Sequence, residues 1–182
     1  IVAMTNAAYY LAFTFAVERR KALAGAGGET FLLANTLSLA VVLASKPLGG
    51  WLSDRVGRRR LMMAVTVLTM LAIIPALGIM LRGSPTEFIL GQVLLAVPLG
   101  VALGLQGAML VEIFPLRTRV TSMSVAYSVT LALAGGTAPL LSTWLIETFQ
   151  DPMLPAYAIL LYGAIGLAIL APMKETNGRS LT

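Results

Sequence analysis

The sequence predicts an all-α protein that crosses a membrane several times. Hydrophobic residues make up 58% of its 182 residues and charged residues only 12%, whereas an ordinary soluble domain carries about 25% charged residues. The apolar residues form long segments, and the charged residues stand in short clusters between them. The segments lack the polar face that a helix of a soluble bundle needs, so both observations indicate a polytopic membrane protein.

Six apolar segments approach or reach the length of a spanning helix, about 20 residues at 1.5 Å rise each. The first segment is the shortest. Because it starts without a methionine, a basic stretch or a cleavage site, we expect the chain to begin inside a helix rather than with a signal peptide. The expected helices are residues 1–17, 31–51, 61–81, 88–111, 120–146 and 153–173.

The loops between six spans must alternate between the two sides of the membrane. Loops 52–60 and 112–119 and the C-terminal residues 174–182 share one side and carry eight basic residues, whereas residues 18–30, 82–87 and 147–152 share the other side and carry four. Since cytoplasmic loops are enriched in Lys and Arg, we expect the first set, including the C-terminus, to be cytoplasmic. The expected location is a bacterial-type inner membrane.

The composition also excludes several classes of function. The chain has no cysteine and no histidine, which rules out disulfides, thiolate or imidazole metal ligands and histidine general bases within it. We therefore expect no metal site, no cofactor and no enzymatic activity. The net charge of +5 is not spread over a solvated face, so it does not indicate nucleic-acid binding. The expected partners are membrane lipid and a small molecule.

The segment "GWLSDRVGRR", residues 50–59, gathers charges between two apolar spans. Its glycines permit close packing and a tight turn, and its aspartate stands beside arginines with which it can pair. Such a cluster is able to hold one conformation and release it in another, but arginines after a span also anchor topology, and charge alone leaves both interpretations open. The residues concerned are Gly50, Asp54, Arg55, Gly57, Arg58 and Arg59.

The spacing G-x-x-x-D-R-x-G-R-R in this segment resembles the cytoplasmic loop between the second and third helices of each half of the major facilitator superfamily. The stretch "VEIFPLRTRVTSMSVAYSV", with Glu112 and Arg119, resembles the superfamily's loop between helices ten and eleven. The stretches "GGTAPLLSTWLIETFQDPMLPAY" and "MKETNGRSL" resemble the metabolite:proton symporter family, and the proline/glycine-betaine transporters most of all.

This resemblance implies that the six helices form the C-terminal half of a twelve-helix transporter and that the N-terminal six-helix half is missing from the sequence. It implies proton-coupled symport of a small zwitterionic or anionic metabolite, such as a proline- or betaine-like osmolyte or a carboxylate, by alternating access. Protons would be the coupling ion, with their acceptor in the missing half. It also implies that Glu112 pairs with Arg55 or Arg58 in a cytoplasmic gating cluster. The alternative is a non-transporting six-helix fragment or a module that packs with another chain.

Polar residues inside spans are costly and are therefore candidates for a substrate pathway, although they also serve as hydrogen-bonding contacts between helices. In the first span their spacing of three and four residues allows them to share one helical face. Tyrosine rings could attract a substituted ammonium group and the amide could bind a carboxylate. The candidates are Asn6, Tyr9, Tyr10 and Thr14 in that span, and Gln106, Tyr127 and Ser128 in later spans.

Lys46 is unusual because it stands five residues before Trp51, inside the expected second span. Its long side chain could extend to the headgroups of the membrane. Alternatively, it could place a cation in the cytoplasmic vestibule and favour an anionic substrate. Both interpretations remain open from the sequence.

The fifth span contains Gly135, Gly136 and Pro139 near its middle. Proline removes a backbone hydrogen bond and glycine lets neighbouring helices approach. We therefore expect a bend at this point, of the kind that helices need if they rock during transport.

Overall fold

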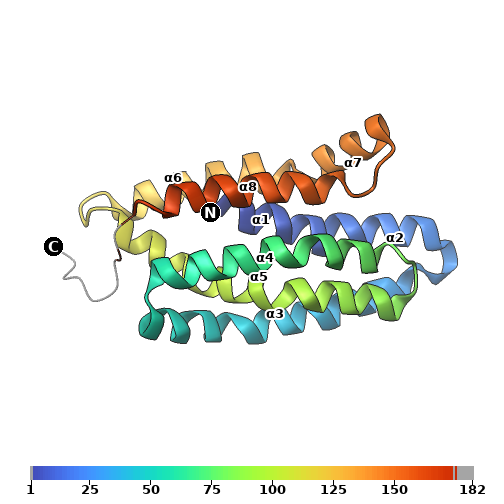
Figure 1. Cartoon of the computed structure of the whole chain (residues 1–182), viewed down its shortest axis with the longest axis horizontal. Helices are drawn as coiled ribbons and strands as arrows, with labels where there is room; N and C mark the ends of the chain where they lie inside the picture. The colour runs from blue at the N-terminus through green and yellow to red at the C-terminus, as the bar shows by residue number, and fades with distance from the viewer. Residues whose placement is uncertain (1, 174, 176–182) are drawn as a thin grey trace.

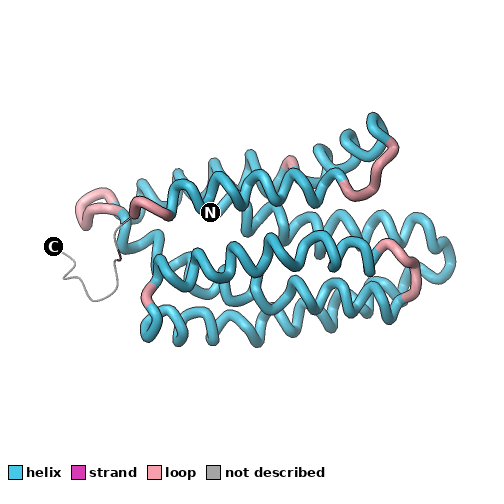
Figure 2. Tube along the Cα trace, in the orientation of Figure 1, coloured by secondary structure: helices cyan, strands magenta, loops and turns pink. Residues whose placement is uncertain are grey.

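A computed structural model describes residues 2–173 and 175 of the chain. Within them, every regular element is helical (Figure 2). The elements are α1 (Val2–Tyr10), the π-helical η1 (Leu11–Phe15), α2 (Ala16–Ala24), the 3₁₀ turn η2 (Gly25–Gly27), α3 (Gly28–Val56), α4 (Arg58–Met80), α5 (Pro85–Ile113), α6 (Arg119–Thr130), the π-helical η3 (Leu131–Gly136), α7 (Ala138–Phe149) and α8 (Leu154–Leu170).

The long helices run antiparallel to their neighbours in the chain, so their turns gather at two opposite ends (Figure 1). Helix α5 packs along both α3 and α4, α8 packs on α4, and α1 packs on η3. The turns at residues 57 and 114–118 lie at one end, which we call the Gly57 end, and those at 25–27, 81–84 and 150–153 lie at the other. This alternation agrees with the expected grouping of loops.

Four helical stretches are long and apolar enough to cross a membrane by length and composition: α3, α4, α5 and the run Arg119–Phe149. Helix α8 is also apolar but has 17 residues. Large apolar side chains such as Leu37, Leu71 and Leu161 are exposed along these helices, as expected where lipid or another helical unit covers them. The membrane-spanning all-α class is therefore confirmed, while the count of six spans stays a prediction.

The helices extend beyond the limits that hydropathy predicted. Residues 52–60 are not a loop, because α3 continues to Val56, α4 begins at Arg58 and only Gly57 separates them. In the same way, α2 carries the charged residues 18–21 to Ala24, so most of the expected loop 18–30 is helical. Arginine, lysine, glutamate and alanine are good helix formers, and a membrane boundary does not oblige the helix to end. Hydropathy located the apolar core of each helix rather than its ends.

Local sequence accounts for several of the helix ends. Helix α5 starts at a capping box in which the Ser84 hydroxyl accepts from the Glu87 amide, with Pro85 in the first turn. Helix α3 ends at Gly57, whose φ of 102° lies in the region that favours glycine. The resulting turn at Gly57 is tight and holds the first turn of α4 directly beside the last turn of α3.

Backbone contact between α3 and α5 fixes the centre of the bundle. A Cβ atom on Gly49 or Gly104 would overlap the backbone of Val101 or Lys46 on the partner helix, and one on Gly100 would overlap Val42 and Ser45. Small residues at these positions let the two helices approach closely. The contact at Gly104 places Lys46 of α3 next to the part of α5 that carries Gln106.

Candidate functional site

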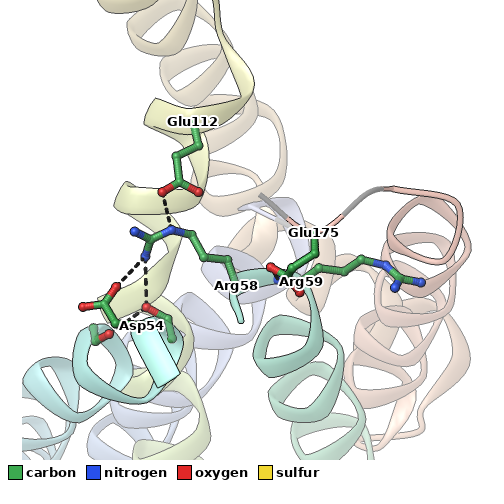
Figure 3. A network of polar contacts seen from close by, with 7 residues as sticks. Asp54, Arg58, Arg59, Glu112 and Glu175 are labelled. Atoms are coloured by element: carbon green, nitrogen blue, oxygen red, sulfur yellow. Dashed lines mark hydrogen bonds and ion pairs between the residues drawn. The ribbon is translucent and has the colours of Figure 1, made fainter. Parts of the chain in front are cut away.

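The first candidate site is a cluster of charged side chains at the Gly57 end (Figure 3). Arg58 Nε donates to Glu112 Oε1 at 2.5 Å, and Arg58 Nη1 lies 3.3 Å from Asp54 Oδ1 and 3.0 Å from the Ser53 hydroxyl. The Arg58 and Glu112 side chains are each 15% exposed, whereas Asp54 is 67% exposed. The pairing of Glu112 with an arginine of the 50–59 segment is therefore present, and it joins α4 to α5.

A second set of contacts at the same end joins α4 to α8 and the residues after it (Figure 3). The Glu175 carboxylate accepts from the Arg59 amide at 3.1 Å and the Arg60 amide at 3.4 Å, at the N-terminus of α4. Arg59 in turn donates through Nε to Leu170 O and through Nη2 to Ala171 O, at the end of α8. A carboxylate at a helix N-terminus and a guanidinium at a C-terminus both complement the helix dipoles.

Two residues assigned to the gating cluster from the sequence, Arg55 and Arg119, make other contacts. Arg55 lies over the Trp51 ring, with its Cζ 3.9 Å from the ring centroid. Arg119 Nε donates to Phe114 O at 3.1 Å, which closes the turn before α6. A Cβ on Gly50 would meet no atom within 4 Å, so the close approach expected there is made by Gly49 instead. Lys174 and Arg179, which were counted among the basic residues of the C-terminal segment 174–182, lie outside the described residues.

The second candidate site is an open groove of about 430 Å³ between α3, α5 and α6. Four residues predicted for the substrate pathway line it: Lys46, Gln106, Tyr127 and Ser128, together with Ser124 and apolar neighbours. Gln106 is only 4% exposed, and its Oε1 atom has no hydrogen-bond partner among the described residues. The structure therefore brings together residues that the sequence marked one by one.

The polar residues of the first span do not join this groove. Asn6 is buried and its Nδ2 donates to Val2 O within its own helix, whereas Thr14 is exposed. Tyr9 packs against Tyr10 and Phe13, with ring centroids 6.1 and 5.2 Å away. The π-helical segment η1 follows Tyr10 and contains Thr14. Its helical turn is wider than that of an α-helix, so Thr14 lies on a different face from the one that a regular α-helix would give it.

The predicted bend falls on a second π-helical segment. Gly135 and Gly136 end η3, and Pro139 lies in the first turn of α7, after Thr137. Gly135 faces the Tyr10 ring, since a Cβ there would lie 3.1 Å from a Tyr10 ring carbon. The change from π-helical to α-helical hydrogen bonding after Gly136 therefore lies close to the contact between η3 and α1.

A buried glutamine in the interior of the bundle was not predicted. Gln92 of α5 is fully buried, and its Nε2 donates to Ala12 O in η1 at 2.9 Å and to Asn35 Oδ1 of α3 at 2.8 Å. Its Oε1 has no partner within the described residues. The only signal in the sequence was a glutamine inside an apolar span, which on the reasoning applied to Gln106 would have qualified it.

Arginines also organise the opposite end of the bundle. Arg20 donates through Nε and Nη2 to Met80 O, at 3.0 and 2.7 Å, and so caps the last turn of α4. Burial, and to a lesser extent the charge of Arg19, lower the pKa of the Arg20 guanidinium, while Glu87 raises it. Both arginines line a cavity of about 240 Å³ with mainly apolar walls.

The sequence model of the Major Facilitator Superfamily matches residues 1–176. The chain belongs to the Major Facilitator Superfamily. It is 31% identical, over an alignment of 184 positions, to a proline/betaine transporter of Salmonella typhimurium. The alignment covers all of this chain and 36% of that protein.

Two further relatives are named as transporters of small metabolites. A citrate-proton symporter of Klebsiella pneumoniae is 36% identical over 159 residues, which cover 86% of this chain and 36% of that protein. An ectoine/proline transporter of Corynebacterium glutamicum is 28% identical over 181 residues, again 36% of its length. The resemblance drawn from the motifs is thus confirmed, and the chain spans about a third of the length of these relatives.

Proposed function

We propose that the chain forms the C-terminal six-helix half of a secondary transporter, which carries a small zwitterionic or anionic metabolite together with protons by alternating access. An N-terminal six-helix half, outside this sequence, would complete the pathway. The observation that carries the proposal is the groove between α3, α5 and α6 that Lys46, Gln106, Tyr127 and Ser128 line. The printed names of the relatives, proline/betaine transporter and citrate-proton symporter, support the class of substrate.

The Arg58 cluster has the geometry of a conformational latch. Arg58 and Glu112 join the ends of α4 and α5 through a mostly buried pair, and Asp54 adds an exposed partner from α3. Ion pairs between helix ends can stabilise one end state and be absent from the other. We assign to Asp54, Arg58 and Glu112 the role of favouring one conformation of the transport cycle, and to the η3–α7 break around Gly135 and Pro139 the role of accommodating the change.

The excess of basic residues at the Gly57 end supports an orientation with this end in the cytoplasm of a bacterial-type inner membrane. None of the described acidic residues lies in the middle of a spanning helix. We therefore place the proton acceptor in the N-terminal half.

Uptake by the complete gene product tests the function. Cells or vesicles that contain the protein should accumulate labelled proline, glycine betaine or citrate, and collapse of the proton gradient should abolish the accumulation. Uptake that persists without the gradient would exclude proton coupling. If none of the three is taken up by correctly inserted protein, this substrate range is wrong. If no other small metabolite is transported either, the result supports the alternative of a non-transporting six-helix fragment or module.

A further inference from the structure

The groove between α3, α5 and α6 has an asymmetric set of polar groups. Of the described residues that line it, Lys46 alone carries a formal charge, and no carboxylate is among them. Tyr127, Ser124 and Ser128 supply hydroxyl groups, and Gln106 supplies an amide. A cation surrounded by hydrogen-bond donors and without a neighbouring carboxylate is suited to an anion rather than to a second cation.

The nearest carboxylates on the same helices are already engaged. Glu112 follows Gln106 by six residues on α5, about 9 Å along a helix axis, and is paired with Arg58. Asp54 follows Lys46 by eight residues on α3 and also pairs with Arg58. Because neither lines the groove, no carboxylate of the part of the chain that the structure describes compensates the positive charge of Lys46 there.

Gln106 adds a second, uncommitted polar group. Its side chain is almost fully buried in the wall, and its Oε1 is hidden without a partner, whereas its Nε2 is not among the hidden unpaired atoms. Nε2 can donate to a ligand carboxylate, whereas the acceptor Oε1 needs a hydrogen-bond donor, such as a ligand hydroxyl group. Lys46 and Gln106 both line the groove, beside the close approach of α3 and α5 at Gly104.

We propose that Lys46 and Gln106 form a carboxylate-binding site in this groove and that Lys46 makes the protein prefer substrates with net negative charge over zwitterionic osmolytes. The proposal rests on the transport function proposed above and names its substrate class. Tyr127 could attract a quaternary ammonium group through its ring, but the cation of Lys46 in the same groove repels such a group. A small carboxylate anion is thus the ligand that the whole lining accommodates, and 430 Å³ gives it sufficient room.

The test measures binding and transport separately, in the complete gene product. Citrate serves as the anionic probe and glycine betaine as the zwitterionic probe, with dissociation constants from calorimetry on purified protein in detergent and apparent affinities from uptake. The variants are Lys46→Gln, which removes the charge, Lys46→Arg, which keeps it, and Gln106→Leu, which removes the amide. Arg82→Gln is the matched control, because Arg82 is an exposed cation at the other end of the bundle.

We expect the unmodified protein to bind citrate at least about tenfold more tightly than glycine betaine. Lys46→Gln should weaken citrate binding about tenfold or more and change betaine binding less than about twofold, since only the anion interacts favourably with the charge. Lys46→Arg should stay within about threefold of the parent, and Gln106→Leu should weaken citrate about three- to tenfold. Arg82→Gln should change neither.

Other outcomes would overturn the proposal. Tighter binding of betaine than of citrate, an equal loss of both probes in Lys46→Gln, or no loss of citrate in that variant would each show that Lys46 does not select the substrate. The two proposals fail in different ways: selective citrate binding without any uptake would contradict transport alone, and citrate uptake that Lys46→Gln leaves unchanged would contradict the carboxylate site alone.

Discussion

Arg58 at the start of α4 and Glu112 near the end of α5 form an ion pair with an N–O separation of 2.5 Å, and each side chain is 15% exposed. Asp54 contacts the same guanidinium at 3.3 Å but is 67% exposed. An exposed pair contributes about 0–1 kcal/mol, whereas loss of the partner of a mostly buried charge costs more. The two carboxylates therefore hold Arg58 unequally.

Glu112→Gln should consequently reduce transport more than Asp54→Asn does. In the complete gene product we expect the initial uptake rate to fall about tenfold for Glu112→Gln and less for Asp54→Asn, with similar amounts of protein in the membrane. Glu147→Gln is the control, because Glu147 is exposed and lies at the opposite end of the bundle. A larger loss in Asp54→Asn than in Glu112→Gln would reverse the order inferred from burial.

Gly49 and Gly50 provide a matched pair for the contact between α3 and α5. A methyl group on Gly49 would overlap the Val101 backbone, whereas one on Gly50 meets nothing within 4 Å. Gly49→Ala should lower stability by about 1–3 kcal/mol, the usual cost of overpacking, and Gly50→Ala should leave it unchanged or raise it. Thermal unfolding of the purified protein measures both, and equal melting temperatures would disprove the close contact.

The orientation can be tested with single cysteines, since this chain has none of its own. Thr118 and Thr148 are both exposed and lie at opposite ends of the bundle. With any cysteines elsewhere in the gene product removed, a membrane-impermeant reagent should label Thr148→Cys from outside intact cells and Thr118→Cys only after the cells are opened. The reverse pattern would place the Gly57 end outside.

Gln92 should hold the π-helical segment η1 in place. Gln92→Leu removes the hydrogen bonds to Ala12 O and Asn35 Oδ1 and should destabilise the protein by about 1–3 kcal/mol. Amide hydrogen exchange should increase around residues 11–16 more than in α4, which Gln92 does not bond. Uniform exchange throughout the protein would indicate a general loss of packing instead.

The sequence predicted the parts of the fold that depend on hydropathy and on fixed spacing. The resemblance to the superfamily implied that Glu112 meets Arg55 or Arg58, and the structure pairs it with Arg58. Glu175 was not singled out, since it follows the last helix in a stretch with no periodic pattern that could place it at the start of α4. Helix ends were also misplaced: Gly57, with its positive φ, ends α3, whereas the change in hydropathy comes several residues earlier.

The candidate groove shows the same division. Lys46, Gln106, Tyr127 and Ser128 were each marked as polar residues in apolar spans, but the packing of α3, α5 and α6 that brings them to one groove could not be predicted from the sequence. For Asn6 and Thr14 the expected common face assumed a regular α-helix. The π-helical turn of Leu11–Phe15 contains neither glycine nor proline, so no residue type in the sequence indicated it.

The contacts of Arg59 and Glu175 have a mechanical consequence. The Arg59 guanidinium donates hydrogen bonds to carbonyls at the end of α8, and the Glu175 carboxylate, which follows α8, accepts from the first amides of α4. Pulling the two helices apart at this end would break these crossed bonds together, and α4 also packs along α8. Helices α4 and α8 are therefore expected to move as one rigid unit. A conformational change of the bundle would then require movement of the other helices relative to this unit.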